Sequence, residues 1–419
     1  MSDNTAVFPY QSPPAWEQRK LGELTESYSG GTPAAGESEF YGGSIPFIRS
    51  AEIAAESTEL FLTEKGYESS SARMVKPGDV LYALYGATSG EVAVSRQKGA
   101  INQAILAILP RDDCDARYIT AWLRKQKGYI VTTYLQGGQG NLSGVIVKNL
   151  EVFIPSLPEQ QKIGFMLSHL DSLITLHQGK YDKLCVLKKS MLDKMFPKGG
   201  SLYPEIRFAG FTDPWEQRKL GEVARRVTRK NENGDSDLPL TISAQYGLVD
   251  QRTFFNSQVA SKDMSGYFLL HRGEFAYNKS TSTDSPWGAI KRLEKYDMGC
   301  VSTLYICFEL LSGDPDFLVT YYETDRWYKA VQLIAAEGAR NHGLLNIAPD
   351  DFFETQICIP KRIDEQRRIG AFFDRLDSLI TLHQRKYDGC ANPLFSERRI
   401  SCRKPSHQNR CSATTTPSG

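Results

Sequence analysis

Two stretches of the chain carry apolar residues at helical spacing, and each predicts one long amphipathic helix. From residue 158 onward the apolar positions advance by three or four residues, and one set recurs every seven residues. This seven-residue set is Ile163, Leu170, His177, Leu184 and Met191. The second stretch repeats the seam with Ile369, Phe373, Leu376, Ile380, His383 and Tyr387. Each seam buries only one stripe of its helix, so each helix needs a partner, and the other copy is the obvious one.

The same polar residue occupies one position of both seams, at His177 and His383. A lone polar residue in a seam costs stability but selects one alignment of the helices. We therefore interpret these histidines as packing and register residues, not as catalysts.

The segments beside the helices alternate short apolar runs with Gly, Pro and Asn, which predicts bodies built from short strands. Residues 80–85, 104–109 and 303–308 are β-branched, aliphatic or aromatic runs of strand length. Residues 118–127 and 316–333 have helical character. The predicted fold class is α+β, with mixed α/β bodies of mostly short strands.

An internal repeat organises the whole chain. Three motifs occur twice: WEQRKLGE at 16–23 and 215–222, PEQQKIG at 158–164 with DEQRRIG at 364–370, and DSLITLHQ at 171–178 and 377–384. The chain is thus two copies of a unit of roughly 200 residues. We expect Trp16 and Trp215, which begin the first motif, to be packing anchors.

The repeat predicts seven consecutive segments. They are an opening motif at 1–23, a first body at 24–156, a central spacer helix at 157–198, a linker with the repeated opening motif at 199–222, a second body at 223–360, a second spacer helix at 361–388 and a divergent tail at 389–419. The tail loses the heptad pattern and places Gly389 and Pro393 where a helix would continue, so we expect it to be disordered. We hypothesise that a frameshift or recombination replaced the original helix end, and a harmless variable tail is the alternative.

The two bodies share glycines but differ in the polar residues beside them. The sequence GQGN at 138–141 corresponds to GARN at 338–341, and GAINQ at 99–103 corresponds to GCVST at 299–303. Two bodies that share their glycines but differ in the neighbouring polar residues favour one task performed on two different targets. Drift after duplication is the alternative.

Composition is that of an ordinary globular protein. The 419 residues include 50 Lys and Arg against 49 Asp and Glu, and 41% are hydrophobic. The formal net charge of +1 argues against a polycationic tail but allows a basic face that is offset elsewhere. No apolar run suits a membrane span, and the first residues lack a signal pattern, so we expect a cytoplasmic protein without membrane contact.

Motifs for catalysis and for metal binding are missing from the sequence. None of the eight cysteines forms a C-x-x-C pair, and no Asp or Glu is followed two positions later by Lys, as in common nuclease sites. The sequence also lacks a P-loop, a G-x-S-x-G, an H-E-x-x-H and the Asp/Asn-Pro-Pro-aromatic motif of amino-methyltransferases. The glycine-rich residues 137–141 could hold a phosphate, although a turn is the simpler interpretation. We therefore expect no catalytic residue, no metal ligand and no cofactor in this chain.

The repeated motifs resemble the specificity subunit of type I restriction–modification systems. The resemblance rests on WEQRKLGE, on Ile-Pro followed by E-Q-x-x-I-G, and on L-D-x-L-I-x-x-x-Q, all present twice, and it covers roughly residues 8–388. The second body also resembles a recurrent domain of this family through GEFAYNKS at 273–280 and GARNHGLLN at 338–346.

The resemblance implies a non-catalytic reader of double-stranded DNA. Each body would be a target recognition domain for one half of a split, asymmetric site. The two helices would pair as an antiparallel coiled coil with pseudo-twofold symmetry, set the gap between the halves and carry two modification (methyltransferase) subunits. Restriction subunits would join this core, and S-adenosylmethionine, ATP and Mg would be bound by these partners.

The chemistry of the side chains indicates which loop residues of the two bodies are candidates for contact with DNA. Arg, Lys, Asn and Gln recognise base edges, whereas many loop cations contact only phosphate. The candidate residues are Tyr85, Thr88, Gln136, Gln139 and Asn141 in the first body, and Asn278, Lys279, Thr281, Arg340, Asn341 and His342 in the second. An ordinary surface-loop position is the alternative for each of them.

Other functions stay open at this point. A self-contained restriction–modification enzyme would need the missing catalytic motifs. An assembly scaffold would bind proteins through the two bodies, and an altered tail could leave an inactive specificity subunit. Salt-dependent binding to duplex DNA would distinguish a DNA reader from a scaffold.

Overall fold

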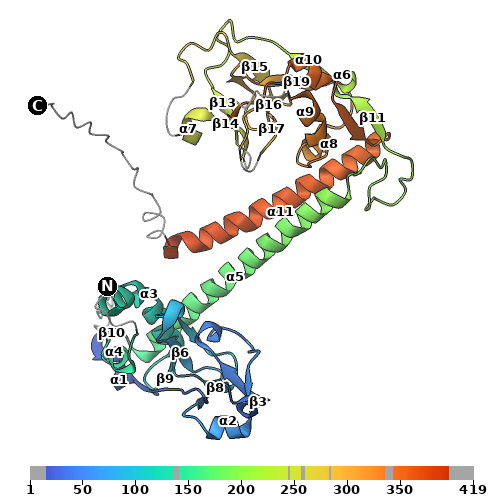
Figure 1. Ribbon diagram of the computed structural model, residues 1–419. Helices are drawn as coiled ribbons and strands as arrows, with labels where there is room; N and C mark the ends of the chain where they lie inside the picture. Colours follow the sequence, from blue (N-terminus) through green and yellow to red (C-terminus); the bar gives the residue numbers. More distant parts are fainter. Residues whose placement is uncertain are drawn as a thin grey trace, which may run out of the picture. The chain divides into compact units, whose positions relative to one another are not determined.

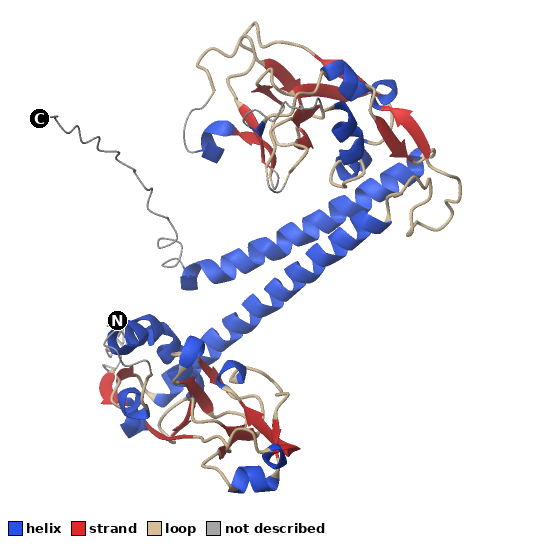
Figure 2. Cartoon of the chain, in the orientation of Figure 1, coloured by secondary structure: helices blue, strands red, loops and turns tan. Residues whose placement is uncertain are grey.

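The chain divides into two compact units, residues 1–175 and 176–419, which share one long helix. The computed structural model describes residues 16–135, 141–243, 246–255, 260–282, 285–335 and 343–395. Figure 1 labels the elements of both units, and Figure 2 distinguishes their helices from their strands.

The first unit contains a body of short strands and helices followed by the start of a long helix. Its strands are β1 (Glu17–Lys20), β2 (Thr25–Ser29), β3 (Tyr41–Ile48), β4 (Phe61–Leu62), β5 (Arg73–Val75), β6 (Val80–Ala83), β7 (Val92–Val94), β8 (Gly99–Ile101), β9 (Ile105–Pro110) and β10 (Glu151–Ile154). Its helices are α1 (Leu21–Leu24), η1 (Ser38–Phe40), η2 (Ser50–Glu52), α2 (Glu64–Glu68), η3 (Gly86–Thr88), α3 (Ala116–Leu135), α4 (Gly144–Lys148) and α5 (Leu157–Lys194), which continues into the second unit.

The second unit repeats this order and ends in a second long helix. Its strands are β11 (Glu216–Lys219), β12 (Ala224–Val227), β13 (Leu240–Ser243), β14 (Gly247–Asp250), β15 (Phe268–His271), β16 (Phe275–Asn278), β17 (Ala289–Arg292), β18 (Met298–Val301), β19 (Ile306–Leu310) and β20 (Gln356–Ile359). Its helices are α6 (Leu220–Val223), α7 (Gln251–Phe255), α8 (Pro315–Tyr321), α9 (Tyr328–Ile334), α10 (Pro349–Phe353) and α11 (Ile363–Phe395).

The internal repeat extends to sheet topology. Each body contains a four-stranded antiparallel sheet, in the order β2-β9-β6-β7 and β12-β19-β16-β17, and a separate strand pair, β1-β10 or β11-β20. The bodies differ beside this shared sheet. The first adds the four strands β4-β3-β8-β5, whereas the second adds the pairs β13-β14 and β15-β18. The copies have therefore kept one framework and diverged around it.

The central strand of each shared sheet is buried on both faces. Val80 and Tyr82 of β6 contribute to one hydrophobic cluster, while Leu81 contributes to another. Tyr277 of β16 likewise lies in one cluster and Ala276 in a second. Successive side chains of a strand point to opposite faces, so a continuous apolar run fits a sheet covered on both sides.

Two of the predicted elements differ from the structure. The predicted helix at 316–333 is wrong as one element, because α8 ends at Tyr321 and α9 begins at Tyr328. The Thr324 hydroxyl donates to the Tyr321 carbonyl at 2.6 Å, a side-chain bond that competes with helix continuation. The strand predicted at 303–308 begins only at Ile306, because a turn bond joins the Tyr305 amide to the Ser302 carbonyl.

In the second unit, α5 and α11 run antiparallel (Figure 1). His177 contacts His383, and further along α5 Lys188 contacts Asp377, so the numbering rises along one helix as it falls along the other. The predicted partnership of the two seams is thus confirmed here, together with the α+β class. None of the helices in the described ranges combines the length and apolar character that crossing a membrane requires.

The ends of the long helices differ from the predicted segments. Helix α5 ends at Lys194 and not at 198, close to the predicted stop. Helix α11 continues to Phe395, so the prediction that helical structure stops at 388 is wrong for 389–395. Extending an existing helix costs far less than starting one, and a proline near its end removes few hydrogen bonds. Residues 396–419 lie outside the described part of the chain.

Candidate nucleic-acid interface

In the first unit, the two loops predicted to contact DNA meet at their bases. The loop that follows β6 begins at Tyr85, which forms an isolated antiparallel bridge with Asn141. Beside this bridge, the Leu142 amide donates to the Leu84 carbonyl at 3.1 Å. Residues 56 positions apart in the sequence thus share one edge of the body, with the exposed Asn141 at its surface.

The loop after β6 is held by short-range hydrogen bonds. Gly86 adopts a φ of 74°, which favours glycine, and it opens the short helix η3. The Thr88 hydroxyl donates to the Tyr85 carbonyl at 3.4 Å, and the Ser89 hydroxyl donates to the Gly86 carbonyl at 2.8 Å. The Tyr85 ring packs against the hydrophobic cluster of the first body. Tyr85 therefore anchors the loop, while Thr88 stabilises its turn.

The second unit repeats this arrangement on its equivalent strand. Ser280, two residues beyond β16, forms an isolated antiparallel bridge with Leu344. The amide and the hydroxyl of Thr281 both donate to the Gly343 carbonyl, at 2.6 and 3.1 Å, and the Leu345 amide donates to the Lys279 carbonyl at 3.0 Å. In both bodies, therefore, the loop after the central strand pairs with a segment that follows the helices.

Asn278 and Lys279 are engaged with the backbone of the second body. The Asn278 side-chain oxygen accepts from the Ser280 amide at 3.0 Å, and the Lys279 ammonium donates to the Ile347 carbonyl at 3.2 Å. Burial lowers the pKa of Lys279 below its ordinary value. These contacts indicate that Lys279 ties the loop to residue 347, so its charge is partly directed inward.

At the end of this loop, the backbone of Gly288 lies close to Asn278 and Tyr277. Gly288 has a φ of 80°, and a Cβ atom there would lie 2.2 Å from the Asn278 carbonyl oxygen and 2.8 Å from the Tyr277 ring. Only glycine fits such a position without moving the loop. The return of the chain at Gly288 thus fixes the backbone around Asn278.

Five of the predicted contact residues lie outside the described residues, namely Gln136, Gln139, Arg340, Asn341 and His342. The six others form two groups in the described part. Tyr85, Thr88 and Asn141 come together in the first unit, and Asn278, Lys279 and Thr281 come together in the second. Whether any of them contacts a base stays a prediction.

The repeated E-Q-x-x-I-G motif attaches each body to its long helix. Gln160 is 1% exposed, and its side chain accepts from the Asp115 amide at 3.0 Å and donates to the Pro155 carbonyl at 2.8 Å. Gln366 makes the equivalent bonds in the second unit, from the Asp314 amide at 2.9 Å and to the Pro360 carbonyl at 2.8 Å. We call each set the glutamine clamp.

A glycine one turn later lets each helix approach its body. A Cβ at Gly164 would lie 2.9 Å from the Tyr118 amide nitrogen, and a Cβ at Gly370 would lie 2.8 Å from that of Phe317. The roles of this glutamine and this glycine were not predicted from the sequence. The repetition of the motif was the only sequence feature that pointed to these roles, since one sequence does not reveal that a glutamine is buried.

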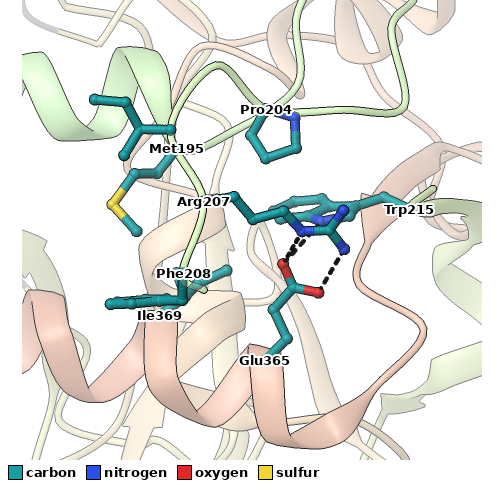
Figure 3. A pocket seen from close by; sticks show the side chains of 8 residues that line it. Met195, Pro204, Arg207, Phe208, Trp215, Glu365 and Ile369 are labelled. Carbon is teal, nitrogen blue, oxygen red and sulfur yellow. Dashed lines mark hydrogen bonds and ion pairs between the residues drawn. The ribbon is translucent and has the colours of Figure 1, made fainter. Parts of the chain in front are cut away.

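The second unit also buries a charged pair beside its tryptophan anchor (Figure 3). The Arg207 guanidinium bonds both carboxylate oxygens of Glu365, at 2.7 and 2.8 Å, and the Trp215 indole nitrogen donates to the same carboxylate at 3.3 Å. The hydrogen bonds that Arg207 donates to the Glu365 carboxylate raise the pKa of Arg207. This cluster joins the linker before β11 to the start of α11.

The two tryptophans differ in burial. Trp215 is 1% exposed and packs against Phe196, which confirms its role as a packing anchor. Trp16 is 47% exposed and meets Tyr118 edge to face. Trp16 is thus only partly an anchor. Its equivalent Trp215 lies beside Phe196 and beside Arg207 (Figure 3), and both of these residues belong to the second unit.

The described side chains offer no built metal centre. No group of three or more His, Cys, Asp or Glu residues in the described ranges could hold a metal ion. The two bodies present hydroxyl, amide and ammonium groups on loops held by a rigid sheet. Such groups are suited to hydrogen bonding with a polar partner surface.

Comparison with known proteins is consistent with this arrangement. Residues 13–185 match the family model described as type I restriction modification DNA specificity domain. The chain is 28% identical over 239 residues to the type I restriction enzyme MjaIX specificity subunit of Methanocaldococcus jannaschii, covering 52% of this chain and 54% of that protein. It is 26% identical over 167 residues to the EcoR124I/EcoR124II specificity subunit of Escherichia coli, covering 38% and 41%. The matched region thus spans about half the length of these curated relatives.

The fold resembles a solved structure over nearly its whole length. The crystal structure of a type I restriction-modification S subunit from M. genitalium aligns with a TM-score of 0.52 at 13% identity, covering 96% of both chains. At this identity the likeness concerns the fold alone.

Proposed function

Residues 13–185 belong to the type I restriction–modification DNA specificity domain family, and on that premise we propose that the chain is a DNA-recognition subunit. In this proposal each body binds one half of a bipartite, asymmetric site in double-stranded DNA. The chain itself carries out no catalysis. The paired helices determine the unread gap between the two halves.

One observation carries the proposal. Two related bodies present loops on equivalent strands, bridged at Tyr85–Asn141 in one and at Ser280–Leu344 in the other. The frameworks correspond, but the side chains on the loops differ. Such a pair suits one task performed on two different sequences, as a bipartite site requires.

The chemistry of these loops supports contact with DNA. Asn side chains can bond adenine in the major groove through both a donor and an acceptor, and Thr can bond a base edge or pack on a thymine methyl. Asn141 is exposed at the edge of the first body. Basic residues around the loops would neutralise phosphates and position the protein without reading sequence.

The partners follow from the family. Two modification subunits would dock on the paired helices, and restriction subunits would join the complex. These partners would bind S-adenosylmethionine, ATP and Mg, consistent with the lack of catalytic motifs in this sequence. The name of each curated relative likewise describes a specificity subunit of an enzyme.

Selection from random DNA tests the proposal directly. The full chain, co-expressed with its modification subunit, is mixed with a pool of randomised duplexes, and bound duplexes are sequenced at several salt concentrations. We expect two enriched half-motifs separated by a constant gap, with affinity falling steeply as salt rises. Binding that is indifferent to salt would contradict a DNA-recognition role and favour an assembly scaffold.

The altered tail makes a second arm of this experiment necessary. The repeat is lost after Asp388, so assembly with partners could be weakened. A variant in which residues 389–419 are replaced by a copy of 183–198 restores the repeat. Enrichment with this variant alone would identify an inactive, C-terminally altered specificity subunit, whereas no enrichment with either protein would reject the proposal.

A further inference from the structure

Lys188 joins three parts of the second unit that are far apart in the sequence. Its ammonium lies 2.6 and 2.8 Å from the two carboxylate oxygens of Asp377 on α11. It also lies 2.7 Å from the Glu323 carboxylate, in the turn between α8 and α9 of the second body. Lys291 of β17 approaches the other oxygen of Glu323 at 3.6 Å. We call these four residues the Lys188 junction.

The lysine at the centre of the junction is largely shielded from solvent. The side chain of Lys188 is 17% exposed and that of Glu323 is 23% exposed, whereas that of Asp377 is 45% exposed. Burial lowers the pKa of Lys188, but the Glu323 and Asp377 carboxylates outweigh this effect and hold the pKa above its ordinary value. The lysine is therefore a stable cation between two carboxylates, and its removal leaves them without their shared partner.

The junction is a further polar attachment point of the body. Ile369 and Phe373 of α11 and Phe196, just beyond the end of α5, already lie in the hydrophobic core of the body. Arg326 also pairs with Asp193 of α5. The glutamine clamp fixes the body to α11 at Gln366, and Asp377 follows eleven residues later, about 16 Å along the helix at 1.5 Å per residue. A polar attachment at this distance from the clamp adds resistance to rotation of the body on the helices.

The first unit offers an internal comparison. Asp171 occupies the position in the repeat that corresponds to Asp377, and it pairs with Arg124 of α3. Both of these side chains are 48% exposed. An exposed pair of this kind contributes little, because solvent screens it and ordering two side chains costs entropy. Within the described residues, Asp377 thus pairs with a largely buried cation that a second carboxylate shares, whereas Asp171 pairs with one exposed cation.

We infer that Lys188 is a positioning residue that fixes the second body on the paired helices and thereby selects the gap between two half-sites. This inference rests on the proposed function. A body of about 140 residues has a radius of gyration of about 14 Å. A pivot of about 14° then moves a reading loop by about 3.4 Å, one base-pair step along a strand. A rotation of this size therefore covers the axial shift that accompanies a change of one base pair in the gap.

The test is the distribution of gap lengths selected from the random duplex pool. The variants are Lys188→Met, Lys188→Arg, the neutral triple variant Lys188→Met/Glu323→Gln/Asp377→Asn, and Lys189→Met as the control. Lys189 is the exposed neighbour of Lys188 on α5, so it matches the charge change without touching the junction. Each variant is assayed as the full chain with the modification subunit.

We expect Lys188→Met and the triple variant to retain both half-motifs but to accept gaps one base pair shorter or longer. Neighbouring gaps should rise about tenfold relative to the preferred one, which corresponds to 1.4 kcal/mol of lost discrimination. Lys188→Arg and Lys189→Met should keep the narrow distribution.

Two results would overturn the inference while leaving the proposed function intact. One is a gap distribution in Lys188→Met and the triple variant as narrow as that of the unchanged chain. The other is loss of both half-motifs in these variants, which would make Lys188 a residue of general stability. If the unchanged chain and its repaired-tail form enrich no motif, the proposed function itself fails.

Discussion

The Nδ1 atoms of His177 and His383 lie 3.0 Å apart, so two copies of one repeated segment meet at the same residue. The two histidines are 206 positions apart, the offset of the DSLITLHQ repeat. When a residue contacts its own equivalent across antiparallel helices, a local pseudo-twofold axis passes between them. One nitrogen donates the shared proton and the other accepts it, so the contact tolerates one proton between the rings but not two.

This histidine pair predicts acid sensitivity of the second unit. Burial and the neighbouring side chains of His177, Lys180 and Lys386 lower the pKa of His383. The unfolded chain therefore binds a proton near the ordinary pKa of about 6.5, whereas the folded chain resists it. The stabilising contribution is present above about pH 6.5 and is lost as the pH falls through the folded pKa.

The measurement compares thermal unfolding of the second unit at pH 7.5 and 5.5. His383→Gln should reduce the difference between the two pH values. His271→Gln, at an exposed strand end of the same unit, should leave it unchanged. An equal pH dependence in all three proteins would exclude the pair as its source.

Loss of the glutamine clamp should destabilise the body that it holds. Gln160→Ala removes the acceptor of the Asp115 amide and the donor to the Pro155 and Asp113 carbonyls. Unsatisfied buried groups cost about 1–3 kcal/mol each, so we expect the free energy of unfolding of the first unit to fall by about 3 kcal/mol. Urea unfolding measures this change, with the exposed neighbour Gln161→Ala as the control. Equal stability of the two variants would show that the clamp is unimportant.

Gly288→Ala should displace the loop around Asn278 in the second body, in addition to straining its own backbone. The added Cβ meets the Asn278 carbonyl oxygen at 2.2 Å, in a backbone conformation with a φ of 80°. Gly273 has a φ of 92° but nothing within 4 Å of its Cβ position, so Gly273→Ala isolates the conformational strain. We expect Gly273→Ala to cost about 1 kcal/mol and Gly288→Ala at least about 2 kcal/mol.

Duplex selection gives the functional readout of this pair. Gly288→Ala should weaken the half-motif of the second body and leave the other half unchanged. If both glycine variants select DNA equally well, the loop around Asn278 does not read sequence.

Arg207→Met should strongly destabilise the start of α11. The Glu365 side chain is 2% exposed. Without the arginine, its carboxylate would keep only the hydrogen bond that the Trp215 indole donates, among the side chains that the structure describes. Removing one partner of a buried pair costs about 3–5 kcal/mol, because the remaining charge stays buried. Arg207→Met/Glu365→Gln should recover part of this loss in urea unfolding. No recovery in the double variant would mean that packing of the arginine, not its charge, stabilises the cluster.

Much of the architecture was predictable from the sequence because the chain repeats itself. Identical motifs indicated two related copies, and the heptad pattern identified α5 and its partner. The break at Tyr322–Trp327 was not predictable, since it depends on a hydroxyl of Thr324 reaching a specific carbonyl. The continuation of α11 to Phe395 was not predictable either, because Gly389 and Pro393 indicated that the helix ends earlier.

The candidate site was predictable only as sets of loops. Polar residues beside shared glycines pointed to these segments, and the structure joins them at Tyr85–Asn141 and Ser280–Leu344, while their contact with DNA stays a prediction. The inward bond of Lys279 could not be foreseen, because residue 347 becomes its neighbour only in the folded chain. The Lys188 junction could not be foreseen for the same reason, since Lys188 and Glu323 lie outside the repeated motifs and meet Asp377 only in the folded chain.

Individual reading residues should affect one half of the site only. Asn141 belongs to the first body, so Asn141→Ala should relax selection at one position of the first half-motif by about 1–3 kcal/mol. Its effect on the salt dependence of binding should be small, because an amide neutralises no phosphate. Thr281→Ala should act only on the second half. Uniform weakening over both halves would instead indicate a structural role for these residues.

Mapping adenine methylation in living cells tests the central claim most directly. The chain is co-expressed with its modification subunit in a host free of methylation, and the genome is sequenced by a long-read method that detects methylated adenine. The account predicts one bipartite motif whose first half is lost when the first body is deleted and whose second half is lost with the second body. An unmethylated genome, both with this chain and with its repaired-tail form, would contradict it.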